Sequence, residues 1–228
     1  MTTATYEREA ADPLCLPPAE AAGLLAAAPW RRLAVMGDSF ACGTGDPSPG
    51  YAEQRWPERV AAALGRGRRP VFQYLNTGVD GLRTAEVRAG QLEQVLAFRP
   101  DLVNVAAGGN DLFVERPDLD AVEAELDAIY GALRAQGADM FTFTVTNVFD
   151  TFPELAAFRE PMAALNERIR AVARRHGAVL VEMWEHPVRL RKTLLSADGI
   201  HFAMEGQAAL ATEIVKALAE RLRAGGAP

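Results

Sequence analysis

Cysteine and long apolar runs are scarce in this chain. Cys15 and Cys42 are the only two cysteines among 228 residues, and their separation matches neither a metal-binding spacing nor a disulfide framework. No stretch approaches 18 uninterrupted apolar residues, which argues against an integral membrane segment. Residues 1–14 are polar and lack the basic, apolar and small-residue regions of a signal peptide. These absences predict a cytoplasmic protein.

An excess of positive charge and glycine-rich loops are also lacking. The 24 lysines and arginines are outnumbered by 30 aspartates and glutamates, and the net charge of −6 argues against nucleic acid as a partner. No glycine-rich phosphate loop follows a strand-like run, which disfavours a nucleotide-binding protein. With 49% hydrophobic and 24% charged residues, the composition is typical of a globular protein, and 228 residues suffice for one domain with a substantial core.

The distribution of apolar residues predicts the secondary structure. Residues 1–30 form an N-terminal extension that is irregular over its first 16 residues and has a short helix at 19–28, introduced by two prolines. From residue 31 to residue 224, short apolar runs alternate with stretches of helical period. The runs predicted as strands are Arg32–Met36, Val71–Leu75, Leu102–Ala106, Met140–Val145 and Val179–Met183. The predicted helices are Trp56–Leu64, Thr84–Phe98, Leu119–Gln136, Glu154–His176 and Glu205–Arg223.

This order of elements predicts an α/β domain. Continuous apolar runs suit strands that are covered on both faces, and the intervening helices make right-handed crossovers between about five parallel strands. In such a sheet, ligands collect at the carboxyl ends of the strands. Ser39, Gly81 and Asn110 follow the first, second and third runs, and Asp198 and His201 precede the last helix. One edge of the sheet can therefore bring these five residues together.

Ser39 is the candidate nucleophile. A serine hydroxyl becomes reactive when an imidazole takes its proton and a third group orients that imidazole. His201 is the best candidate base, because His176 ends a predicted helix and His186 lies in a loop before a proline, positions that suit structural roles. Asp198, three residues before His201, is the candidate orienting group. A cap or turn carboxylate is the other role open to Asp198, and the two roles are compatible.

A nucleophilic serine also needs hydrogen-bond donors directed at the oxygen where negative charge develops. The candidates are the backbone N–H groups of Ser39 and Gly81 and the side-chain amide of Asn110. The glycines that precede Asn110 could equally serve only a tight turn between strand and helix. Asp38 is adjacent to the nucleophile, and we assign it to hydrogen-bonding the loop that carries Ser39.

Four short blocks in register resemble the GDSL family of esterases and lipases, also known as SGNH hydrolases. The blocks are Gly37-Asp38-Ser39, Asn76–Gly81, Gly109-Asn110-Asp111 and Asp198–His201. Phe40 stands where the family usually has an aliphatic residue, and Gly78 is an alternative match for the glycine assigned to Gly81. The resemblance implies a three-layer α/β/α sandwich of flavodoxin-like type and catalysis without a metal or organic cofactor. Consistent with it, no Gly-x-Ser-x-Gly elbow surrounds Ser39.

The resemblance predicts a serine ester hydrolase that acts on a small or lipid-like acyl ester. An acyltransferase would use the same residues to pass the acyl group to an alcohol. A non-catalytic binding module would be expected to lack the serine, asparagine or histidine, and this chain retains all three. Phe40, Phe149 and Phe152 are the candidate wall of the substrate pocket, although Phe149 and Phe152 could equally just cover the end of the sheet. The residues carry no signal for an oligomeric state.

Overall fold

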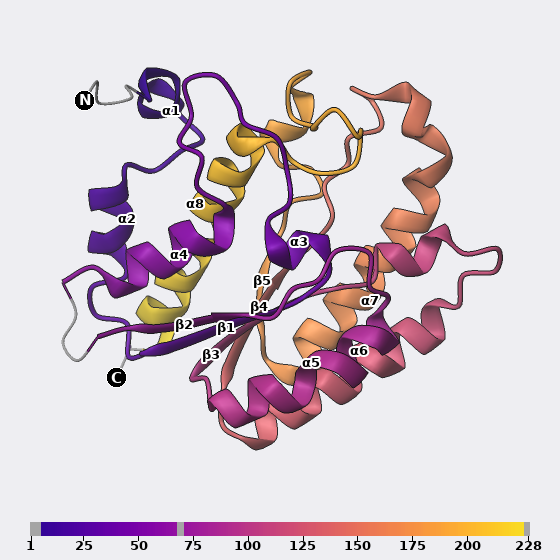
Figure 1. Cartoon of the computed structure of the whole chain (residues 1–228), viewed down its shortest axis with the longest axis horizontal. Coiled ribbons are helices and arrows are strands. Elements are labelled where there is room, and N and C mark those ends of the chain that lie inside the picture. The colour runs from indigo at the N-terminus through magenta and orange to yellow at the C-terminus, as the bar shows by residue number, and fades with distance from the viewer. Residues whose placement is uncertain (1–5, 68–70, 226–228) are drawn as a thin grey trace.

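A parallel sheet of five strands forms the centre of the molecule (Figure 1). The computed structural model describes residues 6–67 and 71–225. The strands are β1 (Arg32–Gly37), β2 (Gln73–Asn76), β3 (Leu102–Ala106), β4 (Asp139–Phe143) and β5 (Val179–Val181). They lie in the order β2-β1-β3-β4-β5, and every neighbouring pair is parallel. This order is the flavodoxin-like one, so the predicted fold class is confirmed.

Helices cover both faces of this sheet, which gives the molecule three layers (Figure 1). One face carries α2 (Pro18–Leu24), α4 (Trp56–Gly65) and α8 (Met204–Gly225), and the other carries α5 (Thr84–Phe98), α6 (Leu119–Ala135) and α7 (Arg159–His176). No helix in the described part of the chain combines the length and the apolar character that a bilayer span requires.

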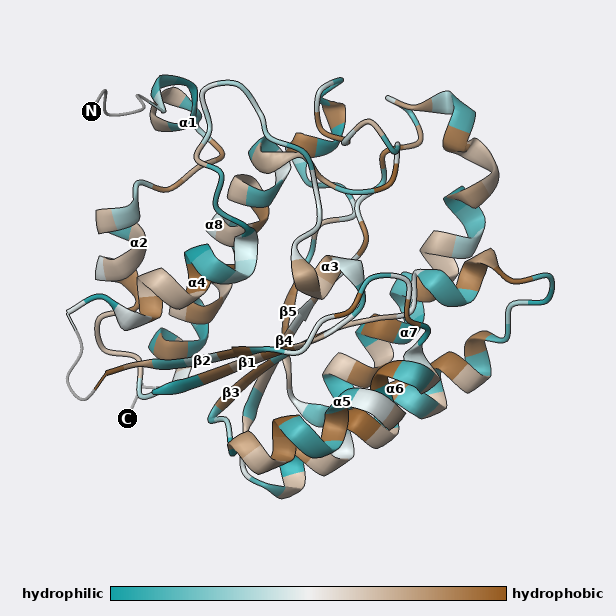
Figure 2. Ribbon diagram, viewed as in Figure 1, coloured by the Kyte–Doolittle hydropathy of each residue, from teal (hydrophilic) through white to brown (hydrophobic). Residues whose placement is uncertain are grey.

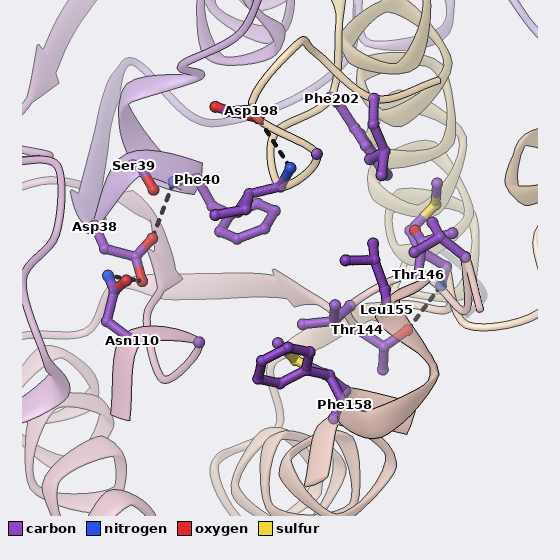
Figure 3. Close-up of a pocket in the computed structure, with 18 of the residues that line it drawn as sticks. Asp38, Ser39, Phe40, Asn110, Thr144, Thr146, Leu155, Phe158, Asp198 and Phe202 are labelled. Carbon is purple, nitrogen blue, oxygen red and sulfur yellow. Dashed lines mark hydrogen bonds between the residues drawn. The ribbon is translucent and has the colours of Figure 1, made fainter. Parts of the chain in front are cut away.

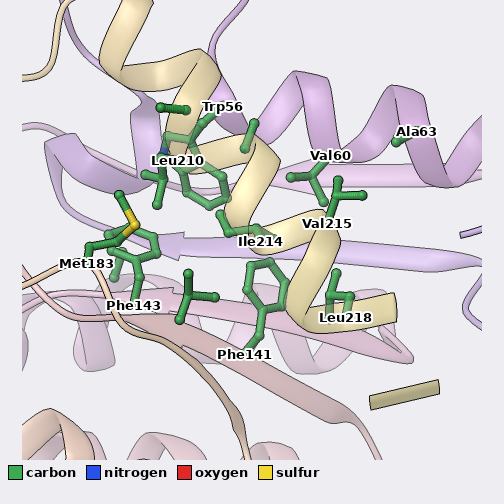
Figure 4. Close-up of a cluster of buried hydrophobic side chains, with 14 of the residues drawn as sticks. Trp56, Val60, Ala63, Phe141, Phe143, Met183, Leu210, Ile214, Val215 and Leu218 are labelled. Atoms are coloured by element: carbon green, nitrogen blue, oxygen red, sulfur yellow. The ribbon is translucent and has the colours of Figure 1, made fainter. Parts of the chain in front are cut away.

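Each face of the sheet has its own hydrophobic cluster. Along β1, Leu33 and Val35 belong to the cluster beneath α4 and α8, whereas Ala34 and Met36 belong to the cluster beneath α5, α6 and α7. In the first cluster, Trp56 of α4 packs edge-on against aromatic rings of β4, as Figure 4 shows. Figure 2 shows the strands mostly in the brown of hydrophobic residues. Because both faces are covered, most strands are largely apolar, as the sequence indicated, whereas the edge strand β2 begins and ends with polar residues and is only partly buried.

The predicted strand boundaries differ from the observed ones by no more than two residues, but one predicted helix is divided. The helix predicted at residues 154–176 begins only at Arg159, and a 3-10 segment, η2 (Pro153–Phe158), precedes it. The reason is Pro161, which has no backbone N–H and is tolerated only in the first turn of a helix. This division matters for function, because η2 contributes to the cavity described below.

The N-terminal extension also differs from its prediction. A short helix, α1 (Glu7–Ala11), lies in the segment that was expected to be irregular. The helix expected at residues 19–28 ends at Leu24, and turns closed by hydrogen bonds from Ala26 to Gly23 and from Ala28 to Leu25 follow it. The proline at position 29 disfavours further helix in the residue before it.

Buried ion pairs connect the extension to the rest of the domain. The Asp12 carboxylate accepts two hydrogen bonds of 2.6 Å from the Arg191 guanidinium and one of 2.8 Å from the Tyr51 hydroxyl. Glu9 pairs with Arg59 of α4 at 2.5 Å, and both side chains are largely buried. Arg191 precedes the loop that carries Asp198 and His201. The extension therefore braces the segment that leads to the candidate site.

Replacing Arg191 with alanine should lower the free energy of unfolding by about 3 kcal/mol at pH 7, because Asp12 would remain buried without its partner. Burial alone would raise the pKa of Asp12, but hydrogen bonds from Arg191, Leu14 and Tyr51 hold it well below its usual range. A carboxyl group whose pKa is lower in the folded state than in the unfolded state stabilises the protein at pH values above its unfolded-state pKa. This stabilisation is lost as the pH falls through the folded-state pKa. The difference between the two proteins should therefore shrink in acid.

Urea unfolding at neutral and acidic pH would measure this difference. Arg88→Ala is the matched control, because Arg88 pairs with Glu125 on the surface and its loss should cost less than about 1 kcal/mol. A cost for Arg191→Ala no larger than that of the control would contradict the bracing role of the ion pair.

Candidate active site

Ser39 lies where β1 turns into the short helix α3 (Ser39–Cys42). The turn requires Gly37, whose φ is +143° and whose position would place a Cβ 1.8 Å from the carbonyl oxygen of Ala106. The buried Gln91 of α5 holds this turn from the side: its amide oxygen accepts from the Gly37 N–H, and its amide nitrogen donates to the Gly37 carbonyl, both at 2.8 Å. Sequence reasoning did not identify Gln91, which gave no signal beyond its helical period.

Ser39, His201 and Asp198 form a continuous hydrogen-bonded chain. The Ser39 Oγ lies 2.7 Å from the His201 Nε2, and the His201 Nδ1 lies 2.6 Å from the Asp198 Oδ2. The other oxygen of Asp198 accepts hydrogen bonds from the backbone N–H groups of Ile200 and His201. Asp198 is thus both a turn carboxylate and a partner of the ring, the two compatible roles that the sequence left open.

The charge on Asp198 is favoured by these same contacts. Burial would raise the pKa of Asp198, but the hydrogen bonds from the His201 ring and from the two backbone N–H groups outweigh burial and lower it. The carboxylate therefore stays ionised near neutral pH. An ionised partner at the Nδ1 position favours the tautomer in which Nδ1 carries the proton and Nε2 faces the serine hydroxyl.

Asp46 organises the loop that carries Asp198 and His201. Its carboxylate accepts from the Ala197 N–H at 2.8 Å, its own N–H donates to the Ser196 Oγ at 2.8 Å, and its carbonyl accepts from the Met204 N–H at 2.9 Å. A polar residue in the loop after Ser39 gives no pattern from which this role could have been predicted. Only the folded chain brings it against a segment 150 residues away.

The other two histidines have structural partners. His176 at the end of α7 lies 2.9 Å from the Asp127 Oδ1 of α6. The His186 Nδ1 accepts from the Val188 N–H, which caps a short 3-10 segment. Neither ring contacts Ser39, so His201 is the imidazole that the fold brings to the serine.

The candidate oxyanion donors differ in whether their N–H groups already donate to another acceptor. Within the described residues, the backbone N–H groups of Ser39 and Gly81 have no hydrogen-bond partner. Gly81 has a φ of +80° and no atom within 4 Å of where a Cβ would be, so its surroundings are open. Gly78, the alternative, donates its N–H to the Asn76 side chain, and a Cβ there would lie 2.8 Å from the Cys42 nitrogen. Gly78 is therefore needed for close packing, and its donor is already used.

Asn110 begins the 3-10 turn η1 (Asn110–Phe113) at the end of β3. Its amide nitrogen donates to the Leu82 carbonyl at 3.0 Å and, more weakly, to the Asp38 Oδ2 at 3.4 Å. Figure 3 shows Asn110 and Asp38 side by side below Ser39. One N–H of the amide is thus held firmly, and the other has only a long contact that a better acceptor could replace.

Asp38 is the buried acid that holds this turn together. Its side chain caps α3 by accepting from the Phe40 N–H at 2.9 Å, which agrees with its predicted role in the loop. Burial raises the pKa of Asp38 to about 7, an effect that the Phe40 N–H opposes and the nearby Asp111 reinforces. Among the described residues, no hydrogen bond joins the Asp38 side chain to the side chain of Ser39 or His201.

A cavity of about 280 Å³ opens beside Ser39 (Figure 3). Phe40 and Phe149, two of the predicted wall residues, line it, but Phe152 does not. Phe152 follows a turn closed by hydrogen bonds from the Thr151 and Phe152 N–H groups to the Val148 carbonyl, and its partly buried ring packs against the hydrophobic cluster. The predicted wall residue Phe152 is therefore not among the residues that line this cavity. Sequence reasoning missed Phe113 and Leu155, and it did not include Phe158 among the wall residues; all three line the cavity.

Comparison with known proteins places these observations in a family. The model of the GDSL-like lipase/acylhydrolase family matches residues 35–209. The chain belongs to this family. The resemblance found in the sequence is therefore confirmed, and membership makes the chain an esterase-type hydrolase of carboxylic esters. A comparison with curated proteins gave no match.

Solved structures support the fold of this GDSL-like hydrolase. TesA is 24% identical, with a TM-score of 0.65 over 82% of this chain and 97% of TesA. The lipase/acylhydrolase from Enterococcus faecalis is 23% identical, with a TM-score of 0.64 over 84% of this chain and 96% of its own. An acetylxylan esterase from Geobacillus stearothermophilus is 20% identical, with a TM-score of 0.65 over 82% of this chain and 94% of its own. At sequence identities below 25%, this structural similarity supports a shared fold and nothing more specific.

This GDSL-like hydrolase departs from the family pattern at Phe40. The Phe40 ring lies 5.9 Å from the His201 ring at a tilt of 53°, and it also lines the cavity. Its backbone carbonyl accepts a 2.7 Å hydrogen bond from the Trp56 indole. The Phe40 side chain therefore both packs against the His201 imidazole and forms part of the cavity wall. Among the described residues, no group of three or more His, Cys, Asp or Glu is arranged to hold a metal ion.

Proposed function

We propose that this GDSL-like hydrolase cleaves a carboxylic ester with Ser39 as nucleophile, His201 as general base and acid, and Asp198 as the group that orients His201. The observation that carries the proposal is the hydrogen-bonded chain from the Ser39 Oγ to the His201 Nε2 and from the His201 Nδ1 to Asp198. A serine without such a partner is a poor nucleophile. The adjoining cavity supplies room for a substrate next to the hydroxyl.

The reaction would proceed in two steps. In the first, His201 takes the Ser39 proton while the Ser39 Oγ bonds to the ester carbonyl carbon. The tetrahedral intermediate then collapses, the bond to the alcohol oxygen breaks, and His201 gives its proton to the departing alcohol. In the second, His201 takes a proton from water, the hydroxide oxygen bonds to the acyl carbon, and the bond to Ser39 breaks. The proton on His201 returns to Ser39 and the acid is released.

The oxyanion of each intermediate would be held by three donors. The Ser39 and Gly81 N–H groups are free to donate, and the second N–H of Asn110 would exchange its 3.4 Å contact with Asp38 for the oxyanion. The hydrogen bond from Asn110 to the Leu82 carbonyl would keep the amide in place during this exchange. Each donor of this kind contributes about 3 kcal/mol to the transition state.

Hydrolysis and transfer of the acyl group to another alcohol would use the same catalytic residues and differ only in the acceptor. The Asp198 side chain is 44% exposed and the His201 side chain 16%, so either acceptor would have to enter from the solvent side of this pair. Turnover of an ester with and without an added short alcohol measures the partition between the two acceptors. Dominant formation of the new ester at modest alcohol concentration would favour the acyltransferase alternative.

A fluorophosphonate probe tests the proposed function directly. Such a probe reacts with a serine that an adjacent base activates, and peptide mapping locates the adduct. We expect the adduct on Ser39 and its absence in Ser39→Ala. Ser48→Ala is the matched control, because Ser48 is a buried serine outside the cavity that accepts a hydrogen bond from the Glu205 N–H. An adduct at another residue, or none on the wild-type protein, would refute the assignment.

A further inference from the structure

The cavity beside Ser39 has a size and a lining that select among esters. We infer that it is an acyl pocket for a saturated, uncharged chain of about ten carbons, an inference that rests on the proposed function. The enzyme would then prefer medium-chain acyl esters over acetyl esters and over long-chain lipids. Four properties of the site carry this inference: the volume, the lining, the closed inner end and the position of the opening.

The volume sets the chain length. The cavity measures about 280 Å³. An apolar cavity of about 150 Å³ holds one benzene molecule, that is, six carbon atoms. The cavity beside Ser39 is nearly twice as large, so by the same proportion the whole of it, including the space next to Ser39 where the carbonyl group would lie, holds about eleven carbon atoms. An acetyl group would leave most of this apolar space unfilled, and a palmitoyl chain would exceed it.

The lining excludes polar acyl groups. Away from Ser39 the wall consists mainly of aliphatic and aromatic side chains, among them Leu155, Phe158 and Met162. The hydroxyl of Thr144, which also lines the cavity, is already used: it accepts from the Met183 N–H at 2.8 Å and lies 3.3 Å from a Glu182 oxygen. A sugar or a charged group in this space would lose most of its hydration and find few partners, the Thr146 hydroxyl among them.

The inner end of the cavity is closed by the hydrophobic core. Phe143, Met183 and Leu210 line it, and each is almost fully buried. Figure 4 shows these three side chains within the cluster between the sheet and α8. Because close-packed interiors yield little, a chain that reaches this end cannot extend further without displacing core side chains. The pocket is therefore limited in length as well as apolar.

The opening shows which half of the ester occupies the pocket. During the proposed reaction the alcohol leaves first, whereas the acyl group stays bonded to Ser39. The exposed lining residues Phe113, Asp198 and Ile200 mark the side of the cavity that faces solvent, from which the alcohol could depart and water enter. A closed cavity suits the group that stays. At its mouth, the rings of Phe113 and Phe158 lie 5.1 Å apart, and Ile200, which is 48% exposed, also lines it.

The test is a series of p-nitrophenyl esters from acetate through butyrate, octanoate and decanoate to palmitate, each below its critical micelle concentration. Burying one methylene can raise kcat/KM by up to about fourfold. We expect kcat/KM to rise at least about a hundredfold from acetate to octanoate or decanoate, and to fall for palmitate. In a second series, acetate esters of alcohols of increasing length, kcat/KM should vary by less than about tenfold.

Substitutions in the pocket should move the optimum in opposite directions. Leu155→Trp fills the cavity and should lower the decanoate-to-acetate ratio of kcat/KM at least about tenfold. Phe158→Ala enlarges it and should shift the optimum towards longer chains, which keeps the test decisive if one variant fails to fold. Leu190→Trp is the matched control, because Leu190 is 61% exposed and lies outside the cavity lining. Its ratio should match that of the wild type.

The outcomes separate the inference from the function on which it rests. If the fluorophosphonate labels Ser39 and acetate is the best acyl group, the medium-chain pocket is refuted and the hydrolase assignment stands. A rate that depends on the alcohol rather than on the acyl chain would refute the placement of the acyl group. If no ester of either series is hydrolysed and Ser39 stays unlabelled, the proposed function itself fails.

Discussion

Ser39→Ala should lower kcat for ester hydrolysis about a million-fold while the protein stays folded. The hydroxyl supplies the atom that bonds to the acyl carbon, and no other hydroxyl lies within hydrogen-bonding distance of the His201 Nε2 in the described residues. The Ser39 side chain is small and almost fully buried, and its loss removes a single oxygen from the turn that Gly37 and Gln91 maintain. The measurement is the steady-state rate together with the melting temperature of the variant.

A double variant sharpens this first prediction. His201→Ala should cost nearly as much as Ser39→Ala, and the double variant should be scarcely slower than either single one, because the two groups act as a unit. Costs that multiplied in the double variant would mean that the two residues act independently. Residual esterase activity near the wild-type level in Ser39→Ala would refute the nucleophile altogether.

Asp198→Asn should lower kcat about ten-thousandfold, with little change in KM. The Oδ1 that accepts from the Ile200 and His201 N–H groups can be kept by asparagine, so the turn should persist. The second atom changes from an acceptor to an amide donor, which faces the His201 Nδ1 at the present distance of 2.6 Å. The ring would then carry its proton on Nε2, and it could no longer accept the proton of Ser39.

The chain offers a matched control for Asp198. Asp127 lies 2.9 Å from the Nε2 of His176, which makes it a second Asp–His pair, far from the cavity. Asp127→Asn should change kcat by less than about twofold, and its effect on stability should be within about 1 kcal/mol. If Asp127→Asn and Asp198→Asn had equal effects on kcat, the orienting role of Asp198 would be untenable.

The sequence was sufficient to predict the architecture and the small set of residues that meet at the site. The inner strands β1 and β3 are largely apolar because both faces of the sheet are covered there, whereas the edge strand β2 is half polar and partly exposed; the apolar pattern is readable without coordinates. Ser39, Asp198 and His201 belong to short blocks of recognisable chemistry, and the parallel sheet brings the ends of its strands to one edge. Their catalytic roles stay predictions until the variants above are measured.

The supporting residues could not be predicted, because their partners are distant in the sequence. Gln91 holds the nucleophile turn from α5, and Asp46 holds the histidine loop across 150 residues. Each is an ordinary polar residue on a helix or in a loop, and nothing in its immediate neighbourhood distinguishes it. Phe152 shows the opposite case: it was expected in the cavity wall, but it packs against the hydrophobic cluster and is not among the lining residues.

Sequence by itself therefore determined the order of elements, the parallel sheet and the candidates for the reactive groups, since periodicity and residue chemistry are local properties of the chain. Only the tertiary structure decided the 2.7 Å contact between the Ser39 and His201 side chains, the buried Asp12–Arg191 pair and the shape of the cavity. These depend on the close packing of side chains from separate elements, where a shift of one ångström changes a hydrogen bond or a volume.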